Sequence, residues 1–232
     1  MKRIAIVQSN YIPWKGYFDL IGLCDEFILY DDVQYTRRDW RNRNRIKTPT
    51  GLQWLTIPVE VTGKYHQRIR DTRISDPDWG RKHWTTLTHN YAKAPFFSHY
   101  RDVFEPLYRS TREPFLSAVN QQFITTIAGI LGVETLLSWS SDYPHVDGRS
   151  ERLVQLCVAS GASVYLSGPA AKGYLDDALF AEAGIGVEWM DYSGYPEYPQ
   201  LFGEFQHGVT ILDLLFNTGP DAGRYMKPRL AT

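Results

Sequence analysis

Residues 3–35 constrain the fold more than any other stretch of the chain. They begin with a short apolar run, pass through a polar loop that ends at Pro13, and continue after Gly16 with apolar residues at helical spacing. A second apolar run over residues 27–30 follows, and it ends in two aspartates. Short apolar runs on either side of an amphipathic segment predict a strand, a helix and a second strand. Such a unit places its strands parallel, with a right-handed crossover.

The rest of the chain mostly repeats this alternation. Apolar runs predict strands at residues 53–59, 134–139, 163–167 and 186–192, and helical spacing predicts helices at residues 150–160, 174–183 and 209–217. Residues 76–132 predict three helices in succession. Strands that alternate with helices favour a mostly parallel, doubly wound, Rossmann-like sheet. We therefore expect residues 1–232 to form a single α/β domain, with the helical segment 76–132 inserted into the sheet or packed beside it.

Composition narrows the class of protein and of partner. The 232 residues include 25 basic and 26 acidic side chains, so no charge surplus would attract nucleic acid or an anionic membrane. No apolar stretch approaches the roughly 20 residues of a membrane span, and the first residues lack the apolar core of a signal peptide. The two cysteines, Cys24 and Cys157, lie in apolar helical patterns. These features predict a cytoplasmic protein without disulfides or a thiolate metal site.

Polar side chains follow three of the predicted strands at the point where each strand ends. Ligands of open α/β sheets bind beyond the carboxyl ends of the strands, so these side chains are expected to share one rim. The set consists of Gln8, Asn10 and Tyr11 after the first strand, Asp31, Asp32 and Gln34 after the second, and Ser167 and Gly168 after a later one. Trp14 and Tyr17 are expected to wall the cleft. Gly16 either offers backbone N–H groups to an anion or only permits close helix packing.

Asp31 and Asp32 are the strongest candidates for acid–base chemistry. Successive strand residues point to opposite faces, so one aspartate is expected to face a ligand while the other caps a helix or orients an arginine. A magnesium ion held by one or two carboxylates is an alternative. Solvated loop aspartates are more common, and no metal site is predicted.

Residues 36–47 carry six arginine and lysine side chains interleaved with asparagines. The pattern has no apolar helical face and predicts a loop or an irregular strand. Arginine with asparagine suits bidentate contacts to phosphate or carboxylate, which favours anion binding over a solvated charged surface. RNA binding is disfavoured because the rest of the chain supplies no basic surplus. The binding residues predicted here are Asn42, Arg43, Asn44 and Arg45. In the strand that follows, the side chains expected to be buried are Trp54, Leu55 and Ile57.

Other nucleophile and base candidates lie outside these clusters. Cys157 stands among leucines and valines, a pattern typical of a core residue. A position at a helix end near His145 or His89 would instead favour thiolate chemistry at Cys157. His145 lies in a loop beside two aspartates, which suits either a general base or, more commonly, a surface histidine. His83 lies on the apolar side of its helix and is expected to be a core residue.

Six separated blocks of the sequence, taken together, resemble the WbqC-like protein family. They read QSNYIPWKGYFDLI, DEFILYDDVQYTRRDWRNRNRIK, GLQWLTIPV, HNYAKAPFF, VYLSGPAAKGYLD and YPQLFGEF with ILDLLFNTG. The resemblance spans nearly the whole chain and implies a bacterial protein encoded among surface polysaccharide (O-antigen) or specialised-metabolite genes. Family members are described as transferases that attach glycine or another acyl group to an amino sugar. Five further predicted binding residues lie in these blocks: Asn90, Tyr91, Tyr174, Tyr198 and Gln200.

The opening strand, loop and helix also resemble the start of nucleotidylyltransferase-like enzymes, in which a histidine after the glycine binds nucleotide phosphates. Tyr17 stands where that histidine would fall. A phenol offers no cation at neutral pH, which argues against adenylate chemistry.

Together these features predict an acyl or aminoacyl transferase that forms an amide or ester on an amino-sugar or amino-acid-derived small molecule. Its partners would be that acceptor and an activated acyl donor, such as a carrier-protein thioester. Asp31 or Asp32 would accept the proton of the attacking amine, with Tyr17 as a further catalytic candidate. Two alternatives are a non-catalytic binding module of a polysaccharide assembly complex and a cysteine-dependent acyl transferase that uses Cys157.

The predicted transferase assigns the other polar groups to binding. Gln8, Asn10 and Asn42 would donate hydrogen bonds to a carbonyl oxygen as negative charge develops on it. Arg43 and Arg45 would hold an anionic group of the substrate.

Overall fold

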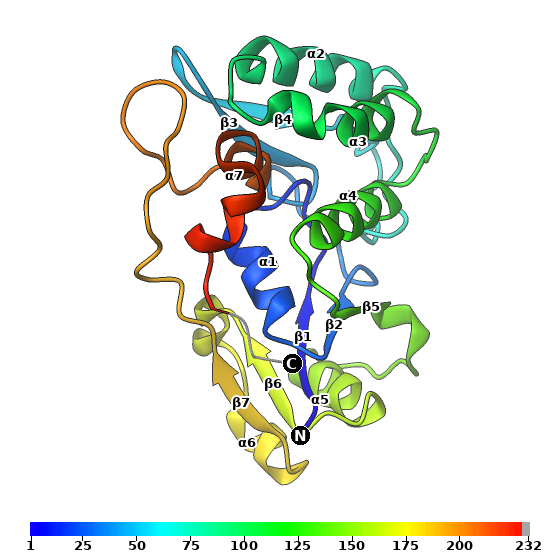
Figure 1. The fold of residues 1–232 in the computed structure, drawn as a ribbon. Helices are drawn as coiled ribbons and strands as arrows, with labels where there is room; N and C mark the ends of the chain where they lie inside the picture. Colours follow the sequence, from blue (N-terminus) through cyan, green and yellow to red (C-terminus); the bar gives the residue numbers. More distant parts are fainter. Residues whose placement is uncertain (229–232) are drawn as a thin grey trace.

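The computed structural model describes residues 1–228 and contains a five-stranded parallel sheet and a two-stranded hairpin (Figure 1). The sheet consists of β1 (Arg3–Val7), β2 (Glu26–Leu29), β5 (Leu136–Trp139), β6 (Val164–Ser167) and β7 (Gly186–Trp189). Its strands lie in the order β5-β2-β1-β6-β7, and every neighbouring pair is parallel. The mostly parallel α/β sheet is therefore confirmed, and its order is consistent with a Rossmann-like sheet.

The first crossover unit forms as its apolar pattern predicts. Helix α1 (Lys15–Gly22) connects β1 to β2, and Phe18 and Ile21 on this helix are fully buried. Cys24, which was expected on the helix, follows its end and donates its backbone N–H to the Ile21 carbonyl at 3.1 Å. The parallel register of β1 and β2 brings the polar residues after each strand to the same edge of the sheet.

The two faces of the sheet bury different sets of residues. Phe27 points into the larger apolar cluster, whereas its neighbour Ile28 points into a smaller one. Alternate residues of a strand face opposite sides of a sheet, so apolar packing covers both faces. Helices α5 (Arg149–Ala159) and α6 (Asp177–Glu182) supply the helical part of the smaller cluster.

The other helices include the three that the sequence predicts in succession. They are α2 (Trp79–Tyr91), α3 (Phe97–Arg109) and α4 (Leu116–Ile130), and α7 (Ile211–Thr218) follows β7. Figure 1 shows α2, α3 and the hairpin beyond the carboxyl end of β1. The 3-10 turns are Ser140–Asp142, Pro169–Gly173 and Gly219–Tyr225. No helix within residues 1–228 is both long enough and apolar enough to cross a membrane.

The hairpin corrects two expectations from the sequence. Its strands, β3 (Arg43–Thr48) and β4 (Gly51–Thr56), are antiparallel and lie outside the parallel sheet, so the arginine-rich residues end in a regular strand. Trp54 is 41% exposed rather than buried, whereas Leu55 is buried as expected. A two-stranded hairpin can bury one face and leave the other in solvent, and Trp54 lies opposite Arg45 on the outer face.

One helix also begins later than its pattern suggests. The helix expected over residues 174–183 starts only at Asp177, because residues 169–173 form a 3-10 turn. Asp176 accepts a hydrogen bond from the N–H of Ala178 at 3.1 Å and caps the helix. This cap, rather than apolar spacing, places the start of α6.

A pair of glycine substitutions tests the packing of α2 against α3. A Cβ atom on Gly80 would lie 1.9 Å from the carbonyl oxygen of Tyr108, so Gly80→Ala forces the helices apart. We expect a loss of about 1–3 kcal/mol in the free energy of unfolding, measured in urea. Gly129→Ala is the control, because Gly129 lies in α4 with no heavy atom within 4 Å of an added Cβ. It should gain about 0.5–1 kcal/mol; equal stability of the two variants would contradict the close crossing.

Candidate functional site

Asp31 fastens the loop after β1 to helix α4. Its side chain is 1% exposed, and its Oδ1 accepts the backbone N–H of Ser9 at 2.8 Å. Its Oδ2 accepts a hydrogen bond from the hydroxyl of Ser117 on α4. Burial raises the pKa of Asp31, while the bonds from Ser117 and Ser9 oppose that rise. Asp31 therefore sets where the loop of Ser9 and Asn10 lies.

Asp32 points the other way and pairs with an arginine of α5. Its Oδ2 lies 2.9 Å from Nη2 of Arg152, and its Oδ1 accepts the hydroxyl of Ser140 at 2.7 Å. Both side chains of the ion pair are almost fully buried. The expectation that one aspartate orients an arginine is confirmed. A cavity of about 220 Å³ lies beside both aspartates, but each carboxylate already accepts hydrogen bonds, and their role as proton acceptors stays a prediction.

A second cavity, which we call the β1 pocket, brings together residues predicted from separate parts of the sequence. It has a volume of about 300 Å³ and is mostly apolar. The predicted members of its lining are Asn10, Trp14, Asn44 and Arg45, and the others are Pro13, Trp40, His207 and Gly208. The pocket thus lies where β1 ends and α1 begins, between the hairpin and the segment before α7.

Asn44 of β3 joins the hairpin to the loop after β1. Its Nδ2 donates to the carbonyl oxygens of Tyr11 at 3.2 Å and Ile12 at 2.9 Å, and its Oδ1 accepts the N–H of Arg45 at 2.8 Å. Ile12 adopts a φ of 37°, a strained value for a β-branched residue. These bonds and the hydroxyl of Thr210, which also donates to the Ile12 carbonyl at 2.8 Å, hold that conformation.

Arg45 is the charged group of the β1 pocket. Its guanidinium carbon lies 5.6 Å from the ring centre of Trp40 and 5.7 Å from that of Trp54. Within residues 1–228, no hydrogen bond or ion pair joins this guanidinium to another group, and its buried Nε has no partner. The Nε atoms of Arg41 and Arg43 are also unpartnered, but their outer nitrogens are not: Arg41 bonds Asn10 and faces Asp39, and Arg43 donates to the carbonyl of residue 38. The arginine run therefore places one unpaired cation in the pocket.

His207 and Gly208 were not singled out by the sequence. They come from an irregular segment between β7 and α7 that the sequence marks only as aromatic and proline-bearing. Partial burial and the charge of Lys15 lower the pKa of His207. Lys15 is 3% exposed, lies 4.8 Å from the ring centre of Tyr195, and has its own pKa lowered to about 8 by burial. Lone residues in an aperiodic segment carry no local signal of a pocket.

Three predicted binding residues meet around a buried carboxylate that the sequence did not reveal. Asp213 of α7 accepts hydrogen bonds from the hydroxyls of Tyr91 at 2.7 Å and Tyr198 at 2.8 Å, and Nε2 of Gln200 donates to it at 2.8 Å. Burial raises the pKa of Asp213. Lys47 donates to Oε1 of Gln200 at 3.0 Å and completes this buried network. Its members tie the segment before α7 to α2 and β3.

Tyr11 and Tyr17 lie in the core rather than on an open cleft wall. The hydroxyl of Tyr11 is 2.8 Å from Nδ1 of His83, whose Nε2 is 3.1 Å from the carbonyl oxygen of Thr56. Tyr17 donates to the carbonyl of Gln8 at 3.1 Å. Burial raises the pKa of both tyrosines well above the usual value. His83 is the core histidine that its apolar helix face predicts.

The remaining predicted residues lie apart from the β1 pocket. The amide of Asn42 donates to the carbonyl of residue 57, that of Asn90 to the carbonyl of residue 86, and that of Gln34 to the carbonyl of residue 65. Tyr174 is exposed, Ser167 is the last residue of β6, and Gly168 follows it. Gly16 admits the ring of Trp14, which an added Cβ would approach to 2.4 Å, as the packing interpretation requires. The single polar cleft expected from the sequence is thus divided into separate sites.

Cys157 is fully buried in the smaller apolar cluster. Burial raises the pKa of its thiol to about 12. This is the core position that its apolar pattern predicts, and it disfavours thiolate chemistry. Among residues 1–228, no group of three or more His, Cys, Asp or Glu side chains is placed to hold a metal ion.

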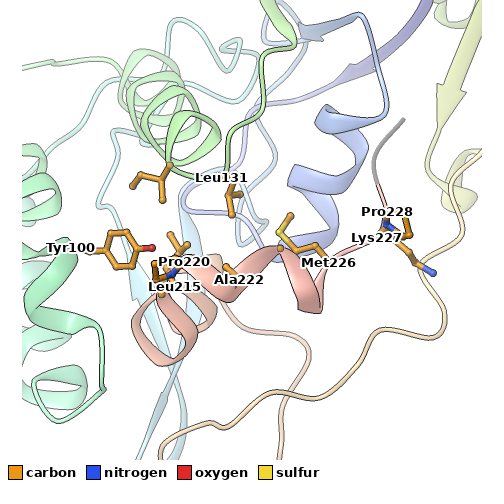
Figure 2. Close-up of a pocket in the computed structure, with 11 residues that line it drawn as sticks. Tyr100, Leu131, Leu215, Pro220, Ala222, Met226, Lys227 and Pro228 are labelled. Carbon is orange, nitrogen blue, oxygen red and sulfur yellow. The ribbon is translucent and has the colours of Figure 1, made fainter. Parts of the chain in front are cut away.

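A further cavity of about 340 Å³ lies between α3, α4 and the end of the described chain. Figure 2 shows Tyr100, Leu131, Leu215 and Met226 around it, with Lys227 pointing away from these side chains. Its lining contains none of the predicted site residues. We take the β1 pocket as the candidate functional site because four of the predicted residues line it.

The buried pair of Asp32 and Arg152 leads to a stability prediction. Removing one partner leaves the other charge buried, so Arg152→Met should lower the free energy of unfolding by about 3–5 kcal/mol. Arg149→Met removes an exposed guanidinium of the same helix that lies 3.7 Å from the ring centre of Tyr174, and it should lower the free energy of unfolding by no more than about 1 kcal/mol. Urea denaturation of both variants measures the difference, and a small loss in Arg152→Met would contradict a buried ion pair.

His83 leads to a prediction of pH dependence. Burial lowers its pKa from 6.5 to about 4, so the unfolded chain takes up a proton at higher pH than the folded one. The stability that the neutral ring contributes is complete above about pH 6.5 and is lost as the pH falls toward 4. Between pH 7 and pH 4.5 the wild type should lose about 2–3 kcal/mol more than His83→Gln. Parallel pH profiles of the two proteins in urea denaturation would contradict a neutral, buried His83.

Similarity to known proteins extends over nearly the whole chain. The uncharacterized protein Rv1507c of Mycobacterium tuberculosis (strain ATCC 25618 / H37Rv) is 52% identical over 227 residues, which cover 98% of each chain. No solved structure matches the chain. The model of the WbqC-like protein family matches residues 8–225, a range that contains the β1 pocket and both aspartates. The chain therefore belongs to the WbqC-like protein family.

Proposed function

We propose that the protein is an acyl or aminoacyl transferase, for example a glycyl transferase, with its active site in the β1 pocket. It forms an amide or ester on an amino-sugar or amino-acid-derived acceptor in surface polysaccharide or specialised-metabolite biosynthesis. The family resemblance supports the class of reaction. One observation supports the site: Asn10, Arg45 and His207, from three distant segments, line the same cavity.

The position of the pocket in the sheet agrees with this assignment. The proposal takes the sheet as doubly wound and related to that of nucleotidylyltransferase-like enzymes. Ligands of such sheets bind at the carboxyl ends of the strands, at the place where the strand order reverses. In this chain that place lies between β1 and β6. Asn10 lies in the loop after β1, and Trp14 directly precedes α1.

His207 is the proposed proton acceptor. Its pKa lies below the usual value, so the ring is neutral at pH 7 and can take a proton. The acceptor amine attacks the carbonyl carbon of the donor, a C–N bond forms, and the bond from that carbon to the leaving group breaks. The amine proton passes to His207 and then to the leaving group. Asp31 and Asp32 are less favoured as bases, because both already accept hydrogen bonds.

Asn10 is the proposed donor to the developing oxyanion. Its Oδ1 accepts a hydrogen bond from Arg41, and its Nδ2 can donate to a ligand. A donor held in a fixed orientation stabilises the negative charge of a tetrahedral intermediate.

Two other functions make different predictions. A non-catalytic module of a polysaccharide assembly complex would bind an acceptor without turnover. A transferase that uses Cys157 needs an accessible thiol and would lose activity on alkylation with iodoacetamide. The proposed enzyme does not use this thiol, which is fully buried, and should retain its activity.

The proposal is tested by mass spectrometry of the purified protein with aminoacyl thioesters and nucleotide-activated amino sugars. The acceptor should gain the mass of the acyl group. His207→Gln should lower the rate by about 10²- to 10⁴-fold, the usual contribution of a general base. His99→Gln, on the exposed face of α3, is the control and should keep the wild-type rate. Absence of any acylated product would contradict the proposed function, and an unchanged rate in His207→Gln would contradict the role of that residue.

A further inference from the structure

The polar groups of the β1 pocket are almost all hydrogen-bond donors. Nδ2 of Asn10 is a donor, and its Oδ1 already accepts one hydrogen bond from Arg41. Nδ2 of Asn44 already donates to two carbonyl oxygens, and its Oδ1 accepts the N–H of Arg45. The indoles of Trp14 and Trp40 offer only N–H groups. The oxygens Oδ1 of Asn10 and Asn44 each already accept one hydrogen bond, and His207 adds a ring nitrogen that can accept.

A sugar ring or an amine beside His207 would not by itself satisfy the donors of Asn10, Arg45 and the two indoles. Hydroxyl groups donate as well as accept, and a buried donor without an acceptor costs free energy. An ammonium group has only donors, and it would also meet the positive charge of Arg45. An oxoanion has only acceptors and carries the opposite charge. The remaining lining is apolar, which suits an apolar body that carries the anion.

The segment before α7 presses directly against the guanidinium of Arg45. A Cβ atom on Gly208 would lie 2.5 Å from Nη2 of Arg45. The indole rings of Trp40 and Trp54 lie near the guanidinium on the hairpin side. Arg45 is thus positioned by packing rather than by a carboxylate, and its outer N–H groups keep their hydrogen-bonding capacity.

We infer that the β1 pocket binds a ligand that carries an oxoanion, either a carboxylate or a phosphate, on an apolar body, and that Arg45 holds the oxoanion. The inference rests on the proposed function only in taking this ligand to be a substrate. It assigns the anion to Arg45 alone, although the sequence offers Arg43 as an equal candidate.

Binding of simple probes tests the inference without knowledge of the substrate. Benzoate and phenyl phosphate carry the two oxoanions on the same ring, and benzamide is their neutral counterpart. Titration calorimetry with the full chain should show both anions binding at least about 10-fold more tightly than benzamide, because charged hydrogen bonds are the stronger ones. Whichever anion binds more tightly identifies the group that the substrate carries.

Three variants locate the binding. Arg45→Gln should weaken the binding of the preferred anion by roughly 10- to 100-fold. Arg38→Gln removes the same charge from an exposed position in the same run and should leave binding unchanged. Gly208→Ala keeps every charge but displaces Arg45, so it should weaken the binding of the anion more than the binding of benzamide. Circular dichroism of each variant establishes that the fold is retained.

Several results would overturn the inference. The first is equal affinity for benzamide and the anions. The second is no binding of either anion at about 10 mM. The third is an equal loss of anion affinity in Arg45→Gln and Arg38→Gln. The proposed function fails separately. If anion binding depends on Arg45 but no acceptor is acylated, the protein is a binding module. If Arg45→Gln leaves acyl transfer unaffected, only the assignment of the anion to Arg45 is overturned.

Discussion

Two consecutive aspartates at the end of β2 hold the carboxyl edge of the sheet together. A buried carboxylate loses its hydration and is stable only where hydrogen-bond donors or a cation replace the water. Asp31 finds its donors on the backbone of Ser9 and the hydroxyl of Ser117, and Asp32 finds a cation in Arg152. The loop after β1, helix α4 and helix α5 are therefore all fastened to one strand end. The same requirement makes these aspartates less available for proton transfer than their position suggests.

The β1 pocket depends on that edge and on side chains that bind backbone groups. Fastening Ser9 places Asn10, and the amide of Asn44 fixes the hairpin to the same loop. The third wall belongs to the segment before α7, where Tyr195 donates to Asp19 at 2.6 Å and Tyr198 donates to Asp213. A pocket assembled from three distant segments in this way needs rigid connections, because small displacements would separate its donors. The buried carboxylates supply those connections.

Prediction from the sequence succeeded where a local pattern is sufficient. The strands of the first crossover and the helical segment follow from apolar spacing, and Asn10 and Arg45 were found because a strand end and an unusual composition mark them. His207 and Gly208 have no such mark, since they lie in an aperiodic segment far along the chain. Trp54 was expected to be buried because its run is apolar, but the hairpin leaves one of its faces in solvent. The run itself does not reveal whether another layer covers that face.

The sequence by itself determined the elements and the parallel pairing of the first two strands, because periodicity decides which side of each element can be buried. It also determined the family. Only the tertiary structure decided which charges are neutralised and which are left to bind a ligand. Arg41 and Arg45 are similar in sequence context, yet Arg41 bonds Asn10 and faces Asp39 while Arg45 has no such partner within the described chain. The free energy of a charge depends on the groups that surround it in space, and most of those groups come from distant parts of the chain.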